Sequence, residues 1–159
     1  MGDGTDNDET PEERANRELI ELLNELRVVL PGVQVLFAFL LGVPFTQRFT
    51  KLGELDQQLY VAAIVATAAA TVFLVAPTAH HRLRFRSGVK EDLLRTANVF
   101  AIVGLVLLAF AVSAVSYVVI GMVDASPVPQ LVAAGLAALA VLTWFVLPVI
   151  YRRKPTPSA

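Results

Sequence analysis

The densest group of residues that could do chemistry is a basic segment near the middle of the chain, from His80 to Lys90. Its arginines alternate with Leu83 and Phe85, a pattern typical of a segment at a bilayer surface, with guanidinium groups among lipid phosphates. Each such cation would contribute about 1 kcal/mol with anionic lipid. The cations that would contact an anionic headgroup or a partner are Arg82, Arg84, Arg86, Lys90 and Arg95. The simpler interpretation is a loop that sets membrane topology and also touches lipid, and the alternative is a specific site for an anionic ligand or a partner protein.

The two histidines of this segment do not predict a metal site. Adjacent residues on a helix or strand point in different directions, and the chain has no cysteine and no third histidine. The sequence shows no catalytic-triad spacing, no paired catalytic carboxylates and no glycine-rich phosphate loop. We therefore expect neither an enzyme nor a cofactor. One short basic loop without a recognition fold does not predict nucleic-acid binding either.

A second set of candidates consists of uncharged polar residues inside long apolar stretches. Ionisable residues within a membrane usually mark function, but these stretches contain none at their centres. The polar residues that could line a pathway or form bonds between helices are Gln34, Asn98, Thr67, Thr71, Ser113 and Ser116. Hydrogen bonding between helices is the simpler of these two interpretations.

Four apolar stretches must position these residues. A helix needs about 20 mainly apolar residues to cross the hydrocarbon core of a bilayer. The chain is 55% hydrophobic and 17% charged, with a mean hydropathy of +0.61, whereas soluble domains are about a quarter charged. We predict an all-α fold, a polytopic transmembrane four-helix bundle in residues 31–151. Its helices are expected at about 31–49, 58–79, 97–123 and 128–151.

A cytoplasmic amphipathic helix is predicted ahead of the bundle, in residues 10–30. Thr10 can cap this helix and Pro11 fits its first position. Leucines spaced by three and four residues form one apolar stripe: Leu19, Leu22, Leu23, Leu26 and Leu30. The stripe would lie on the bilayer, pack on the bundle, or form a short coiled coil between copies. Residues 1–9 are acidic and polar, so we expect them to be disordered.

Prolines and small residues predict how the helices are shaped and packed. Pro31 and Gly32 are expected to break or kink the chain at the membrane. Pro44 frees a backbone carbonyl near Leu40, which a neighbouring helix or hydroxyl would have to satisfy. Rows of small residues, such as the alanines of residues 62–70, permit close approach of helices within one chain or in a homodimer.

The charges near the membrane ends predict the orientation. Eleven lysines and arginines lie on one side and only Arg48 and Lys51 on the other. This bias places both termini, the central loop and the basic tail 152–159 in the cytoplasm. Gln34 and Asn98 are then both expected near cytoplasmic helix ends, where they could bond to each other.

Two local motifs carry a resemblance to a known family. They are the stretch from Arg17 to Leu41, containing Leu30-Pro31-Gly32, and the segment Ala76-Pro77 through His81-Arg82 and Phe85-Arg86 to Asn98. These motifs resemble DUF6328, small bacterial four-helix membrane proteins, over about residues 14–150. The resemblance implies a multi-pass protein of the bacterial cytoplasmic (inner) membrane but no established activity. Some members carry the label sodium:proton antiporter, which the lack of an acid at membrane depth does not support.

Two classes of function fit these observations. The first is a non-enzymatic membrane module of unknown physiological role, which contacts anionic headgroups or a protein partner through its basic loop. The alternative is a small ion or proton channel or transporter, assembled as an oligomer, with a pathway lined by the polar intramembrane residues. We favour the first because the apolar stretches contain so few polar groups.

Overall fold

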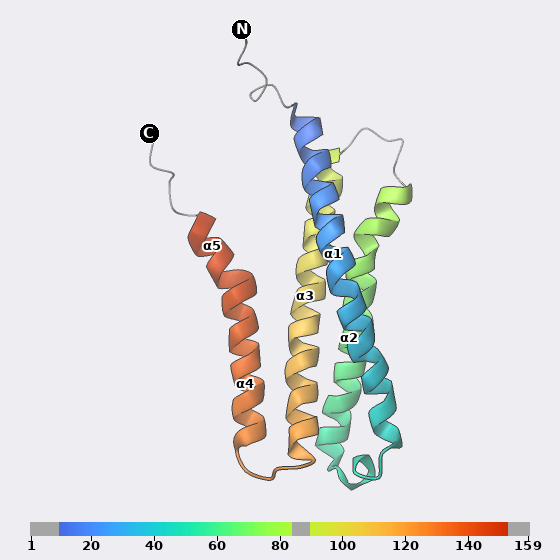
Figure 1. Cartoon of the computed structure of the whole chain (residues 1–159), viewed down its shortest axis with the longest axis vertical. Coiled ribbons are helices and arrows are strands. Elements are labelled where there is room, and N and C mark those ends of the chain that lie inside the picture. Colours follow the sequence, from blue (N-terminus) through green and yellow to red (C-terminus); the bar gives the residue numbers. More distant parts are fainter. Residues whose placement is uncertain (1–9, 84–89, 153–159) are drawn as a thin grey trace.

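The structure is a computed structural model that describes residues 10–83 and 90–152 (Figure 1). Within those ranges every regular element is a helix and none is a strand. The long helices run alternately up and down, so that one end of the molecule, the upper end in Figure 1, carries Pro11, Leu83, Lys90 and Arg152. The lower end carries the two connections at residues 43–53 and 122–127.

Helix α1 (Pro11–Gly42) begins where the sequence predicts. The Thr10 hydroxyl accepts a hydrogen bond from the backbone N–H of Glu13 at 3.3 Å, and the Glu13 carboxylate accepts one from the backbone N–H of Thr10 at 2.9 Å. This reciprocal cap satisfies two of the N–H groups that a helix start leaves without partners. The predicted helix start is confirmed.

Helix α1 does not end at Pro31, so the predicted division at residues 30 and 31 is wrong as a helix boundary. Pro31 removes only one hydrogen bond, to the carbonyl four residues earlier. Leu26 and Val33, on either side of it, are both buried in one cluster with Leu74 of α2 and Leu108 of α3. Burial on both sides stabilises the helix through the proline. The chain leaves the α-helix only after Gly42, in two short 3₁₀ turns, η1 (Val43–Phe45) and η2 (Phe49–Lys51).

Helices α2 (Glu54–Leu83) and α3 (Lys90–Gly121) share the most extensive contact in the molecule. Both are longer than the predicted spans 58–79 and 97–123 at their upper ends, and α2 also begins earlier. The prediction counted uncharged residues, whereas a helix continues through charged ends, and Glu54 and Asp56 complement the dipole at the start of α2. The two helices approach closely at Gly104, where an added Cβ would lie 2.7 Å from Cγ of Leu74.

Helix α1 packs against both α2 and α3. At its lower end Leu40 is buried with Tyr60 of α2 and Val118 of α3. The Tyr60 hydroxyl donates a hydrogen bond to the Leu40 carbonyl, which Pro44 leaves without its helical donor. This confirms that a hydroxyl of a neighbouring helix satisfies the carbonyl freed by Pro44.

The last membrane-length segment is less regular than the single helix predicted at 128–151. Helix α4 (Val128–Val141) passes into a π-helical turn, η3 (Leu142–Val146), and then into the short helix α5 (Leu147–Arg152). The backbone N–H of Leu147 donates to the carbonyl of Leu142, five residues earlier. Pro148 has no N–H to offer the carbonyl of Trp144, so the helix is interrupted at this turn.

Four segments of the described chain are long and apolar enough to cross a membrane: Arg17–Phe45, Glu54–Ala79, Arg95–Gly121 and Val128–Ile150. Their mean hydropathies lie between 2.2 and 2.7. The four predicted membrane-capable helices are therefore present. Every connection between them joins helix ends on the same side of the molecule (Figure 1).

Candidate functional site

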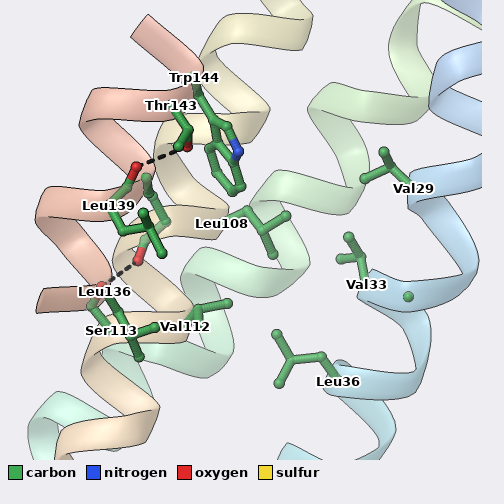
Figure 2. A pocket seen from close by; sticks show the side chains of 13 residues that line it. Val29, Val33, Leu36, Leu108, Val112, Ser113, Leu136, Leu139, Thr143 and Trp144 are labelled. Atoms are coloured by element: carbon green, nitrogen blue, oxygen red, sulfur yellow. Dashed lines mark hydrogen bonds between the residues drawn. The ribbon is translucent and has the colours of Figure 1, made fainter. Parts of the chain in front are cut away.

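A groove lies between α1, α3 and the α4–η3 segment (Figure 2), with a volume of about 400 Å³. Valines, leucines and alanines from three helices form nearly all of its walls. The lining residues are Val29, Gly32, Val33, Leu36, Leu108, Ala109, Val112, Ser113, Leu136, Leu139, Ala140, Thr143 and Trp144. Its volume lies in the usual range of about 300–1,000 Å³ for small-molecule sites.

The groove exists because α4 packs on α3 and makes at most slight contact with α1 or α2. Figure 1 shows α4 and α5 beside α3, on the side away from α2. Of α4, only Pro129 is buried. Gly32 of α1 adds width to the opposite wall, because a Cβ built there would meet nothing within 4 Å. The fold therefore leaves a long gap between α1 and α4 with α3 as its floor.

The two hydroxyl groups in the groove are already bonded within their own helices. Ser113 donates to the carbonyl of Ala109 and Thr143 to the carbonyl of Leu139, each at 2.8 Å. The bonds from Ser113 and Thr143 are the dashed lines in Figure 2. Because both hydroxyl protons are used, these side chains offer the groove little beyond their apolar carbons and oxygen lone pairs.

Trp144 is the aromatic wall of the groove. It lies in the π-helical turn η3, and its side chain is 39% exposed. Turns of this kind inside α-helices occur often at functional sites. The indole N–H has no hydrogen-bond acceptor among the described residues, so it is the one free donor in the groove wall.

The six predicted polar residues do not meet in this groove. Only Ser113 lines it. Thr67 is fully buried and donates to the carbonyl of Ala63, and Thr71 donates to the carbonyl of Thr67, so both hydroxyls are bonded within α2. Ser116 is half-buried on α3 and lines neither described cavity.

Gln34 and Asn98 lie at different heights, which corrects the expectation that both are near the same helix ends. Gln34 is eight residues before the end of α1 at Gly42, and Asn98 is 23 residues before the end of α3 at Gly121. At 1.5 Å per residue these positions are about 12 Å and about 34 Å from the lower ends of their helices. Both side chains are exposed, so they do not bond to each other across α1 and α3.

The predicted basic contact surface lies mostly outside the described residues. Arg84 and Arg86 are not described, and Arg82 and Lys90 are described only as backbone, in the last turn of α2 and at the start of α3. Arg95 is exposed near the upper end of α3. Arg27 is also exposed, but it lies near the middle of α1, 15 residues before the end of that helix at Gly42.

A smaller polar cavity of about 180 Å³ lies at the lower end, against Asp56, Tyr117 and Asp124. Asp124 accepts a hydrogen bond from the backbone N–H of Ser126 at 2.8 Å, which lowers the pKa of its carboxyl below the usual value. The Ser126 hydroxyl accepts from the backbone N–H of Val128 at 3.2 Å. These bonds hold the turn that leads into α4. No group of three possible metal ligands occurs in the described ranges.

Sequence reasoning missed most of the groove residues, Trp144 and Gly32 among them. The one sequence feature that could have indicated this site is Pro148, four residues after Trp144. A proline there cannot donate to the Trp144 carbonyl, so it indicates an irregular helix turn at this position. Nothing in the local pattern indicated that α4 would pack mainly on α3. The groove depends on which helices touch, and similar apolar sequences permit several such arrangements.

Four membrane-capable helices and an apolar groove between them define the class: this is a multi-pass membrane protein. Residues 8–148 match a family of unknown function, DUF6328, so the chain belongs to that family. The resemblance seen in the sequence is thus confirmed over nearly the whole chain. No curated protein and no solved structure matches it.

Proposed function

We propose that this protein is a non-enzymatic, lipid-contacting membrane module whose groove holds the hydrocarbon chain of an amphiphile with an anionic headgroup. The single observation that carries the proposal is the groove between α1, α3 and α4, an apolar slot open along the side of the molecule. Apolar clefts between membrane helices are filled by hydrocarbon, and a slot with shaped walls selects among chains by packing.

The position of the groove along the helices suits a lipid of one leaflet. Leu136 and Trp144 are eight and 16 residues beyond the start of α4 at Val128, or about 12 and 24 Å along the helix axis. Against a hydrocarbon core about 30 Å thick, this covers the middle and the upper half. With the upper end in the cytoplasm, as the charge bias predicts, the chain comes from the inner leaflet.

The charges near the upper end supply the preference for an anionic headgroup. Arg95 is exposed on α3, and the undescribed segment adds Arg84 and Arg86. Each cation near an anionic surface contributes about 1 kcal/mol. Packing in the groove and attraction at the headgroup would then act on the same molecule.

The test uses the single tryptophan of the chain, Trp144. In vesicles containing phosphatidylglycerol with a brominated acyl chain, bromine in the groove quenches the indole fluorescence. We expect stronger quenching than with the equally brominated phosphatidylcholine, because the two lipids share their acyl chains and only the first has a net anionic headgroup. Equal quenching by both lipids would show that Trp144 meets bulk lipid only.

A pair of glycine variants provides the matched control. Gly32→Leu places a side chain in the groove, whereas Gly135→Leu on α4 places it outside, and at both sites an added Cβ meets nothing within 4 Å. Both changes raise helix propensity by a similar amount, about 0.8–1 kcal/mol. Gly32→Leu should remove the extra quenching and Gly135→Leu should leave it. The same result from both variants would contradict the proposal.

The channel or transporter alternative stays a prediction from the sequence. The described hydroxyls of Thr67, Thr71 and Ser113 are bonded within their own helices, so the geometry gives it no specific support. Cation and proton flux in proteoliposomes, compared with the Gln34→Leu/Asn98→Leu double variant, tests it directly.

A further inference from the structure

Gln34 presents a carboxamide on the outer surface of α1 without a partner. The side chain is exposed, and no hydrogen bond to it occurs within residues 10–83 and 90–152. It lies within the membrane-capable span Arg17–Phe45, about 12 Å above the end of α1. A hydrocarbon core about 30 Å thick places that amide well inside the membrane.

An unpaired amide at this depth is unfavourable. Lipid tails offer neither donors nor acceptors, and each unsatisfied polar group in hydrocarbon costs several kcal/mol. The amide is too far from the ends of α1 to reach the headgroups as a long cationic side chain would. Gln34 therefore needs a partner that the described residues of one chain do not supply.

The surface around Gln34 is shaped for close approach of another helix. Ala38 and Gly42 follow at intervals of four residues on the same face, and both are exposed. A Cβ built on Gly42 would meet nothing within 4 Å. Rows of small residues let two membrane helices approach closely, and a polar side chain in such a row forms hydrogen bonds between them.

We propose that Gln34, Ala38 and Gly42 form the contact of a homodimer in which α1 packs against α1 of a second copy. A carboxamide carries both donors and an acceptor, so two copies related by a twofold axis satisfy each other without any further group. Dimers with twofold symmetry are the commonest oligomers, and their interface uses the same surface of both copies. A different protein would have to bring its own polar group to the same depth.

The dimer is independent of the proposed lipid groove. The groove is lined by Val29, Val33 and Leu36, which are on other faces of α1 than Gln34. Helix α1 contacts α2 and α3 with Leu26, Val33 and Leu40, and this leaves the row at residues 34, 38 and 42 uncovered. A second copy can therefore dock without closing the groove.

Cysteine cross-linking tests the contact, because the natural chain contains no cysteine. Ala38→Cys in membranes should give a disulfide-linked dimer on mild oxidation. Val61→Cys is the matched control, since Val61 is exposed on α2 and is adjacent to Tyr60, which is buried in one cluster with Leu40, two residues after Ala38. Equal cross-linking of the two variants, or none at Ala38→Cys, would overturn the proposal, as would cross-linking of Ala38→Cys only to another protein.

The role of the carboxamide is tested by energy transfer between labelled copies diluted into lipid vesicles. Gln34→Leu should raise the dissociation constant of the dimer about three- to twentyfold, since bonds of this kind contribute about 0.6 kcal/mol on average and up to about 1.7. Asn98→Leu removes an exposed amide at a different height and should leave the constant unchanged. Thermal unfolding of each variant shows whether it is folded. A folded Gln34→Leu variant that dimerises as tightly as the native chain would exclude this contact.

Discussion

The α2–α3 pair and the α4–η3–α5 segment are similarly apolar, yet they are held in the molecule in different ways. In α2 and α3 the buried residues include Ala70, Leu74 and Ala101, and the helices approach so closely at Gly104 that no Cβ fits. In the last segment, Val128–Ile150, only Pro129 is buried. Hydropathy therefore shows that a helix belongs in the membrane and not how tightly it packs there.

This difference separates structural from functional regions. Membrane helices gain no hydrophobic stabilisation from one another, so their association depends on packing and hydrogen bonds. Small residues at the α2–α3 contact allow dense packing, whereas α4 packs mainly on α3 and borders a groove. The tightly packed pair forms the dense part of the structure, and the loosely packed segment borders the groove for which we propose a lipid chain as occupant.

The largest effect is expected for Gly104→Ala, in the tightly packed pair. The added Cβ would lie 2.7 and 2.8 Å from Cγ and Cδ2 of Leu74, which is itself fully buried. Overpacking of this kind costs about 1–3 kcal/mol. Thermal unfolding in detergent should show the loss, and the control Gly135→Ala on α4 should be neutral or slightly stabilising, because nothing lies within 4 Å there. Equal stabilities for the two variants would break the comparison.

An effect of comparable size is expected for Tyr60→Phe, at the contact between α1 and α2. The change removes the hydroxyl that donates to the Leu40 carbonyl and leaves that carbonyl unpaired, at a cost of about 1–3 kcal/mol in a buried site. The ring keeps its packing against Phe49, whose centroid is 5.1 Å away. The measurement is again the free energy of unfolding.

Pro44→Ala supplies the matched background for the tyrosine variant. An alanine at this position has a backbone N–H that can donate to the Leu40 carbonyl. Tyr60→Phe should therefore cost less in the Pro44→Ala background than in the native chain, and a double-mutant cycle measures the difference. Additive costs would show that the hydroxyl and the proline are not coupled through this carbonyl.

The sequence alone predicted the helices well and their contacts poorly. The length of the uncharged stretches predicted all four spans. That the Leu40 carbonyl lacks a helical donor followed from the absence of an N–H in Pro44. Of the break or kink expected at Pro31, the break did not occur, because Leu26 and Val33 are buried on both sides of the proline. Gln34 was placed too near a helix end because the prediction started a new helix at residue 31. The groove at Trp144 depends on packing between α3 and α4, which no local pattern encodes.

The smallest effect on stability, and the most informative for the loosely packed segment, is expected for Pro148→Ala. An alanine at 148 restores the N–H that can donate to the Trp144 carbonyl, and this favours replacement of the π-helical turn by regular α-helix. Each residue of an α-helix turns by about 100°, so a shift of register by one residue would turn Trp144 away from the groove.

Because α4 has few buried contacts to lose, the free energy of unfolding should change by less than about 1 kcal/mol. The extra quenching by brominated phosphatidylglycerol should nevertheless fall to the level of phosphatidylcholine. A large loss of stability with unchanged quenching would mean that the last segment is packed as tightly as α2 and α3, and that the groove does not depend on the turn.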